Sequence, residues 1–134
     1  MINALNTEFY MFLLSILECL IAFMIGSVPF GIYVCRYFNL ALPNTYGSKN
    51  IGASNVARQN LAAGALTLLL DALKGAAAIL FLKSSSWAVF FVVLGHCYSP
   101  IMNFNGGKGV ATALGALLVL QFHLTLILIL MWAM

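Results

Sequence analysis

The sequence predicts an all-α integral membrane protein that forms one domain over residues 1–134, with about four transmembrane helices. Two observations indicate this fold class. Hydrophobic residues make up 63% of the chain and charged residues 7%, whereas soluble domains carry roughly 25% charged residues. The apolar residues also fall into four long runs, close to the roughly 20 residues that cross a bilayer, while the polar residues gather in two glycine-rich loops.

The first apolar run extends from Phe9 to Ile25, with Ser15 and Glu18 as its polar members. It is followed by Gly26-Ser27-Val28-Pro29, a cluster that should end or kink a helix because proline lacks an N–H and clashes with the preceding turn. We therefore expect a first span and then a short half-helix over Phe30–Leu40 near the membrane interface.

The next segments are a polar loop at Pro43–Asn60 and a second span at Leu61–Leu82. The 22 residues of this span would reach about 33 Å in an α-helix. Asp71 and Lys74 lie three positions apart in it, on one helical face, where they can neutralise each other. Because ionisable groups inside a membrane are costly, we interpret them as an internal ion pair that helps helices to pack.

A third apolar run covers Trp87–Met102 and is interrupted by Gly95-His96 and by Pro100. We interpret His96 as a buried hydrogen-bonding group. A second polar loop, Asn103–Gly109, leads into a final run, Val110–Met134, which we expect to be the fourth span. That run has no basic anchor and no polar tail at its end, so we expect the chain to be the N-terminal part of a larger helical bundle.

The net charge of +3 comes from six scattered Lys and Arg residues, a pattern that does not indicate a nucleic-acid partner. Basic residues concentrate in the cytoplasmic loops of membrane proteins. The first loop region holds Arg36, Lys49 and Arg58, the second holds Lys108, and the connection between the second and third spans holds only Lys83. The N-terminus is therefore expected outside and both glycine-rich loops in the cytoplasm.

Both loops have the composition of anion-binding segments. Gly47–Arg58 combines small residues, hydroxyls, amides and an arginine fork suited to phosphate oxygens, although a solvated, turn-rich connector accounts for the same residues equally well. In Asn105–Gly109, successive glycine N–H groups can form a nest at the start of a helix, and Lys108 adds a full positive charge. A helix cap with a topology-setting lysine is the alternative reading of this second loop.

Five motifs in this order resemble those of the bacterial acyl-phosphate:glycerol-3-phosphate acyltransferases. They are Gly26-Ser27-Val28-Pro29-Phe30-Gly31, Gly47 to Arg58, Asp71 with Lys74 and Gly75, Gly95-His96 with Pro100, and Gly106 to Thr112. The chain departs from the family at Lys49, where glycine is usual, at Ser54, where threonine is usual, and at Pro100, which falls one position later than in many relatives. Family members also continue to a third polar motif with a His and an Asn, so the chain resembles a member truncated at its C-terminus.

The resemblance implies transfer of a fatty acyl group from acyl phosphate to the 1-hydroxyl of glycerol 3-phosphate. The product would be lysophosphatidate, formed at the bacterial inner membrane in the first acylation step of phospholipid synthesis. The resemblance also implies site residues. The catalytic ones are Ser48, Asn50, Arg58 and Lys108. Those that bind the substrate phosphate are Gly106, Gly107, Gly109 and again Lys108.

Asp71, Lys74 and His96 are expected to be structural polar residues. No metal or organic cofactor is indicated. The three cysteines, Cys19, Cys35 and Cys97, lack CxxC spacing and predict neither a disulfide framework nor a metal site.

Two other functions stay open on the residues alone. A small four-span multidrug transporter would also be short, apolar and marked by one acid in its first span, as Glu18 is here. Such a transporter does not need loops rich in Asn, Gly and Lys. A non-catalytic membrane fragment would only pack with other spans through small-xxx-small faces, such as Ala72 with Ala76 and Ala111 with Gly115.

Overall fold

The computed structural model describes residues 2–82 and 86–133, and this part of the chain contains helices and no strand. In order, the elements are α1 (Ile2–Gly26), α2 (Phe30–Tyr37), α3 (Ala53–Ala57), α4 (Leu61–Phe81), α5 (Ser86–Cys97), a 3-10 helix (Pro100–Met102), α6 (Val110–Leu120) and α7 (Phe122–Ala133). The all-α prediction is confirmed. Lys83, on which part of the topology argument rests, lies outside the described residues.

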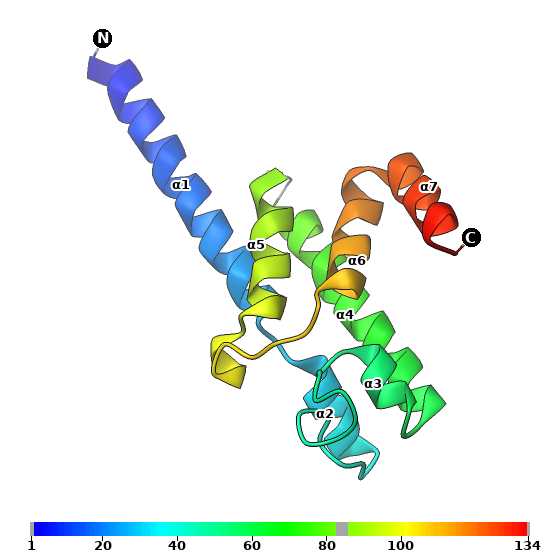
Figure 1. Cartoon of the computed structure of the whole chain (residues 1–134). Helices are drawn as coiled ribbons and strands as arrows, with labels where there is room; N and C mark the ends of the chain where they lie inside the picture. The colour runs from blue at the N-terminus through cyan, green and yellow to red at the C-terminus, as the bar shows by residue number, and fades with distance from the viewer. Residues whose placement is uncertain (1, 83–85, 134) are drawn as a thin grey trace.

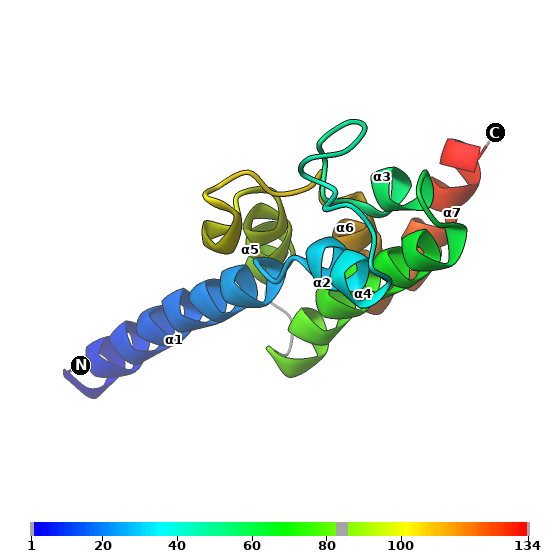
Figure 2. The same ribbon diagram turned by 90° about the horizontal axis from the view of Figure 1, so that it is seen from below.

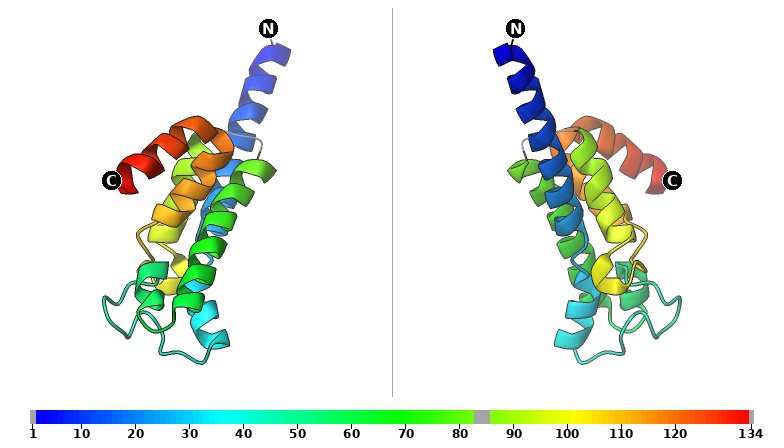
Figure 3. Two further views of the ribbon diagram at one scale, coloured as in Figure 1. Left: turned by 90° about the vertical axis from the view of Figure 1, so that its right-hand side faces the viewer. Right: turned by 90° about the vertical axis from the view of Figure 1, so that its left-hand side faces the viewer.

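The helices form an elongated bundle in which α5 packs on α1 and α6 packs on α4. The N-terminal part of α1 extends past the other helices as a single rod (Figures 1 and 2). The connections that contain the two glycine-rich loops both lie at the opposite end, together with α2 and α3 (Figure 3). The fold therefore gathers the polar loops at one end of an apolar bundle.

Two described segments are long and apolar enough to cross a membrane, Asn6–Tyr37 and Leu61–Phe81. Three shorter apolar helices follow, at Trp87–Met102, Val110–Leu120 and Phe122–Met131. The first segment includes the break between α1 and α2, as Pro29 predicts, although α2 ends at Tyr37 rather than Leu40. The first two expected spans are thus present at full length, and the third and fourth are represented by shorter helices.

The prediction of one continuous final span at Val110–Met134 is wrong, because the described part of this run consists of two helices. Gln121 leaves the helical conformation, with φ −145° and ψ 71°, so α6 ends there and α7 turns away from it. The Gln121 N–H still donates to the Leu117 carbonyl of α6 (2.7 Å), and the Gln121 carbonyl accepts from the Thr125 backbone N–H (3.0 Å) and hydroxyl (2.8 Å) of α7. The apolar run alone carries no sign of this break.

The predicted loop at Pro43–Asn60 contains the one-turn helix α3, and Asn60 caps the next helix because its side-chain oxygen accepts from the Ala63 N–H at 3.0 Å. Small residues set the spacing of the larger helices. A Cβ added at Gly26 of α1 would overlap the Val92 carbonyl of α5, and one at Gly115 of α6 would overlap the Ala72 carbonyl of α4. The helix backbones therefore touch where these glycines lie, as is usual between membrane helices.

Candidate active site

The break between α1 and α2 is closed by side chains from two other parts of the chain. The Lys74 ammonium of α4 donates to the Val28 carbonyl at 2.7 Å, and the Ser99 hydroxyl donates to the Ser27 carbonyl at 2.6 Å. Both carbonyls would otherwise lack an intrahelical partner beside Pro29. The motif around Pro29 is thus tied to α4 and to the segment that follows α5.

Lys74 belongs to a buried polar cluster that joins α4, α5 and α6. Its ammonium lies 2.7 Å from Asp71 Oδ1, which is the pair that their spacing predicts. His96 Nδ1 of α5 lies 3.6 Å from the same oxygen and 3.3 Å from the Thr112 hydroxyl of α6. The exposed fractions of Asp71, Lys74 and His96 are 2%, 5% and 4%, so removal of one charged partner would leave the other charge buried without compensation.

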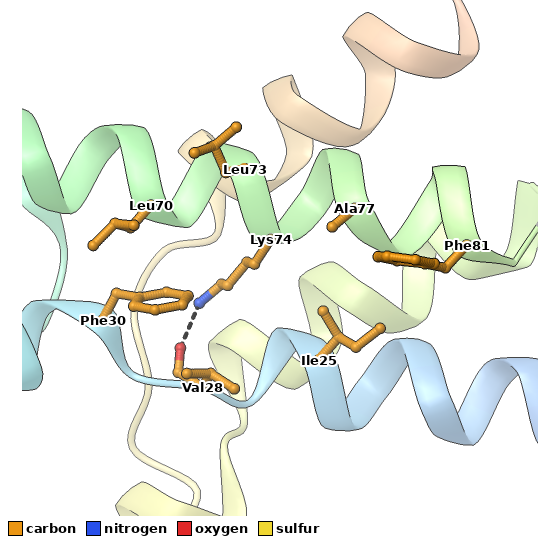
Figure 4. A pocket seen from close by; sticks show the side chains of 8 residues that line it. All are labelled: Ile25, Val28, Phe30, Leu70, Leu73, Lys74, Ala77 and Phe81. Atoms are coloured by element: carbon orange, nitrogen blue, oxygen red, sulfur yellow. Dashed lines mark hydrogen bonds between the residues drawn. The ribbon is translucent and has the colours of Figure 1, made fainter.

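An apolar groove of about 380 Å³ lies beside this cluster, between α4 and the α1–α2 segment (Figure 4). Its only charged lining group among the described residues is Lys74, whose ammonium points across the groove to the Val28 carbonyl. The lining residues are Ile25, Val28, Phe30, Leu70, Leu73, Lys74, Ala77 and Phe81. Such a lining suits hydrocarbon and offers little to a phosphate group.

The first glycine-rich loop is organised by Asn55, a residue that the sequence argument did not single out. Its side-chain amide donates at 2.9 Å to the carbonyls of Pro43, Tyr46 and Asn50. Its side-chain oxygen accepts from the Ser48 N–H at 3.1 Å. Asn55 is buried at the centre of the loop, and its place inside the Gly47–Arg58 motif was the only available signal of this role.

The residues proposed for chemistry in this loop lie around that hub. Ser48 and Arg58 are exposed, and the Asn50 side-chain oxygen accepts from the Gly52 N–H at 2.8 Å. A Cβ added at Gly47 would lie 3.7 Å from Arg58 Nη1, so the guanidinium lies beside the start of the motif. The hydroxyl and the guanidinium are therefore both free to meet a ligand at the surface.

Lys49 has φ +57°, a left-handed conformation that costs an ordinary residue about 1–2 kcal/mol and glycine little. This backbone angle accounts for the glycine that is usual at this position in the acyltransferase family that the motifs resemble. The loop keeps the left-handed turn even though the side chain is lysine.

The second glycine-rich loop folds back on the end of α5. The Gly106 N–H donates to the Cys97 carbonyl at 2.9 Å, and the Gly107 N–H donates to the His96 carbonyl at 3.0 Å. These two amides satisfy carbonyls at the end of a helix. Lys108 is exposed immediately before Gly109, the residue that precedes α6 with φ +75°, so its charge lies at the positive end of the α6 dipole.

The arrangement brings the two glycine-rich loops to one end of the bundle (Figures 1 and 3). Within residues 2–82 and 86–133, no group of three or more His, Cys, Asp or Glu could hold a metal ion. Glu18 lies on α1, two helical turns before the break at Gly26, and is half-buried. It is separate from both loops.

Comparison with known proteins identifies relatives of this chain. The model of the family described as "Glycerol-3-phosphate acyltransferase" matches residues 16–134. Curated proteins of the same name share 45% identity over 124 residues in Jannaschia sp., 48% over 116 residues in Bordetella petrii and 45% over 132 residues in Colwellia psychrerythraea. These alignments cover 87%, 79% and 92% of this chain and 61%, 55% and 67% of the relatives. The chain thus spans about three fifths of the length of these relatives.

Two solved structures are similar to this fold. Both are of PlsY (YgiH), described as an integral membrane glycerol 3-phosphate acyltransferase, in its glycerol 3-phosphate form (TM-score 0.74, 35% identity) and its lysophosphatidic acid form (TM-score 0.73, 33% identity). They cover 88% and 87% of this chain, and 63% and 62% of the PlsY chain is matched. The likeness to an integral membrane protein, together with the apolar helices, identifies a multi-pass membrane protein.

Proposed function

Because the chain belongs to the glycerol-3-phosphate acyltransferase family, we propose that it forms the N-terminal part of an enzyme that transfers a fatty acyl group from acyl phosphate to glycerol 3-phosphate. The observation that carries the proposal is the family match over residues 16–134, which includes both glycine-rich loops. The glycerol 3-phosphate and lysophosphatidic acid forms of the similar PlsY support the choice of acceptor and product.

In the reaction, the 1-hydroxyl oxygen of glycerol 3-phosphate bonds to the acyl carbonyl carbon, the anhydride C–O bond breaks, and inorganic phosphate leaves; the hydroxyl proton balances its charge as hydrogen phosphate. Acyl phosphate is already activated, so the protein does not need to supply a covalent nucleophile. Its tasks are to place two phosphorylated substrates together and to stabilise the negative charge on the reacting carbonyl.

The second loop is the proposed phosphate site. Lys108 supplies a compact positive charge at the start of α6, where the helix dipole adds to it. Gly109 gives the loop its left-handed turn. The N–H groups of Gly106 and Gly107 are used within the fold, so these two glycines serve the proposed site by allowing the backbone to pass close to α5.

In the first loop, Ser48, Asn50 and Arg58 are the proposed substrate-binding and orienting residues. Arg58 offers a planar fork for phosphate oxygens, and Ser48 offers an exposed hydroxyl in the same loop. Asn50 holds the turn at Gly52. We place the protein in the bacterial inner membrane, with both loops in the cytoplasm and the N-terminus outside, because the exposed basic residues Arg36, Lys49, Arg58 and Lys108 lie in α2 and the two loops.

The test replaces Lys108 with Arg, which keeps the charge and orientation but exchanges a point charge for a bulky planar fork. Since the chain covers about three fifths of its relatives, it is joined to the C-terminal part of the Bordetella petrii protein for the assay. The measurement is release of inorganic phosphate from palmitoyl phosphate that depends on glycerol 3-phosphate, with purified protein in detergent. Lys108→Arg should lose at least about tenfold in rate, or roughly 1.4 kcal/mol, and Lys108→Ala should lose more.

Lys49→Arg is the matched control, because Lys49 is also an exposed loop lysine and has no proposed catalytic role. It should keep the native rate. Native rates in both Lys108 variants would show that Lys108 is only a topology anchor. The multidrug transporter alternative based on Glu18 is not favoured by the relatives, and glycerol-phosphate acylation in a Glu18→Gln variant should remain close to native.

A further inference from the structure

Gly107 lies directly against the imidazole ring of His96. A Cβ added at Gly107 would overlap this ring, and the three nearest atoms that it would meet are His96 Nε2, Cδ2 and Cε1. The neighbouring Gly106 differs, because its Cβ would overlap the backbone carbonyl groups of His96 and Cys97. Among the described glycines, positive φ angles occur at Gly47 and Gly109 and not at Gly107. The need for glycine at 107 therefore arises from the ring and not from the local backbone conformation.

The ring cannot move aside freely, because the buried cluster holds its other edge. Nδ1 lies 3.3 Å from the Thr112 hydroxyl and 3.6 Å from Asp71 Oδ1, and Asp71 is itself paired with Lys74 at 2.7 Å. All four residues are buried. A rotation of the ring would take Nδ1 away from a buried carboxylate, which is costly in an apolar interior.

His96 also holds the same position of the loop through its backbone, because its carbonyl accepts from the Gly107 N–H at 3.0 Å. Ring and carbonyl together restrain residue 107 in two directions. Lys108 follows immediately, and Gly109 begins the entry into α6. Any displacement at residue 107 is therefore passed to the charge that is proposed to bind phosphate.

We infer that His96 is a positioning residue. Its ring is held in place by Asp71 and Thr112, it fixes the position of Gly107, and it thereby orients Lys108. The inference rests on the proposed function in assigning Lys108 to a phosphate, but the contact between ring and glycine stands independently of it. Gly107 is accordingly glycine to make room for His96, and not because a substrate approaches its Cα.

The inference is tested by Gly107→Ala in two backgrounds, native and His96→Asn. Asparagine keeps a polar amide near the position of Nδ1, facing Asp71 and Thr112, but lacks Nε2 and Cε1, the far edge of the ring. The added methyl group then has space. Gly106→Ala is the matched control, because its overlap with carbonyl groups of the backbone is the same in both backgrounds.

The first readout is the thermal unfolding midpoint of this chain in detergent, which needs no enzymatic activity. Gly107→Ala should lower the midpoint by about 4 °C or more in the native background and by less than half of that drop in the His96→Asn background. Gly106→Ala should lower it equally in both. Equal losses for Gly107→Ala in the two backgrounds would overturn the inference.

The second readout separates positioning from a purely structural role, using the chain joined to the C-terminal part of its relative. A loop that presents Lys108 only part of the time weakens apparent affinity. Gly107→Ala should therefore raise the KM for palmitoyl phosphate or for glycerol 3-phosphate at least about tenfold, and change kcat by less than about threefold. The His96→Asn background should restore most of the KM.

Thr112→Val provides a second route, since it keeps the side-chain shape and releases one hold on the ring; the effect of Gly107→Ala on KM should be smaller in it. If Gly107→Ala lowers the unfolding midpoint less in the His96→Asn background but does not change KM, then His96 supports only the fold, and its positioning role is withdrawn. If the native protein transfers no acyl group, the proposed function fails, while the unfolding midpoints still decide the contact between His96 and Gly107.

Discussion

Asn55→Asp is expected to open the first glycine-rich loop, although the two side chains are nearly the same size. The Asn55 amide nitrogen donates to three carbonyl oxygens, those of Pro43, Tyr46 and Asn50, each at 2.9 Å. Aspartate would place a carboxylate oxygen at that position. Two N–H donors would be lost, and an acceptor would then face three other acceptors.

The size of the effect follows from these contacts. The loss of two N–H donors, which serve three carbonyls, costs about 1 kcal/mol per donor, and the buried carbonyls left without donors add about 1–3 kcal/mol. A total of roughly 3–5 kcal/mol is enough to open a loop that has a one-turn helix of its own. The rest of the bundle should stay folded, because α4, which the loop contacts through α3, also packs on α5 and α6.

Limited proteolysis with trypsin measures the opening, because Lys49 and Arg58 lie in the loop and are exposed. A loss of roughly 3 kcal/mol should raise the cleavage rate about 100-fold when opening is fast relative to cleavage. Asn50→Asp is the matched control: it adds the same charge to the same loop, but the Asn50 side chain acts as an acceptor from Gly52, a role that a carboxylate keeps. Cleavage of the Asn55 variant at the rate of the Asn50 variant would refute the role given to Asn55.

Three further outcomes are expected. Lys49→Gly should lower the rate of the same tryptic cleavage after Arg58, because glycine relieves the left-handed strain at φ +57° worth about 1 kcal/mol; faster cleavage would count against this. Ser99→Ala should destabilise the bundle by about 1–3 kcal/mol in a chemical denaturation series, because the buried Ser27 carbonyl loses its 2.6 Å donor, and an unchanged midpoint would contradict it. Single cysteines at Ser54 and Asn105, in a background without native cysteines, should be shielded from an impermeant thiol reagent in intact cells; labelling of both from outside would reverse the orientation.

The sequence alone determined the all-α membrane class, the first two spans and the family to which the chain belongs. Composition required an apolar environment, Pro29 marked the break after the first span, and the three-residue spacing of Asp71 and Lys74 predicted their pairing. These features are local: a proline removes its own N–H and residues three apart share a helical face whatever the rest of the fold does. The order of the five motifs added the family, because it too is written in the chain.

Only the tertiary structure decided what these groups meet. Lys74 donates to the Val28 carbonyl, 46 positions away in the sequence, and Ser99 donates to the Ser27 carbonyl, 72 positions away. His96 contacts Thr112 of the next helix. The same holds for Asn55, whose partners depend on how the loop closes, and for Gln121, whose helix break is hidden in an apolar run. Such partners depend on which helix faces touch, and that is fixed by close packing across the whole bundle, which no local spacing records.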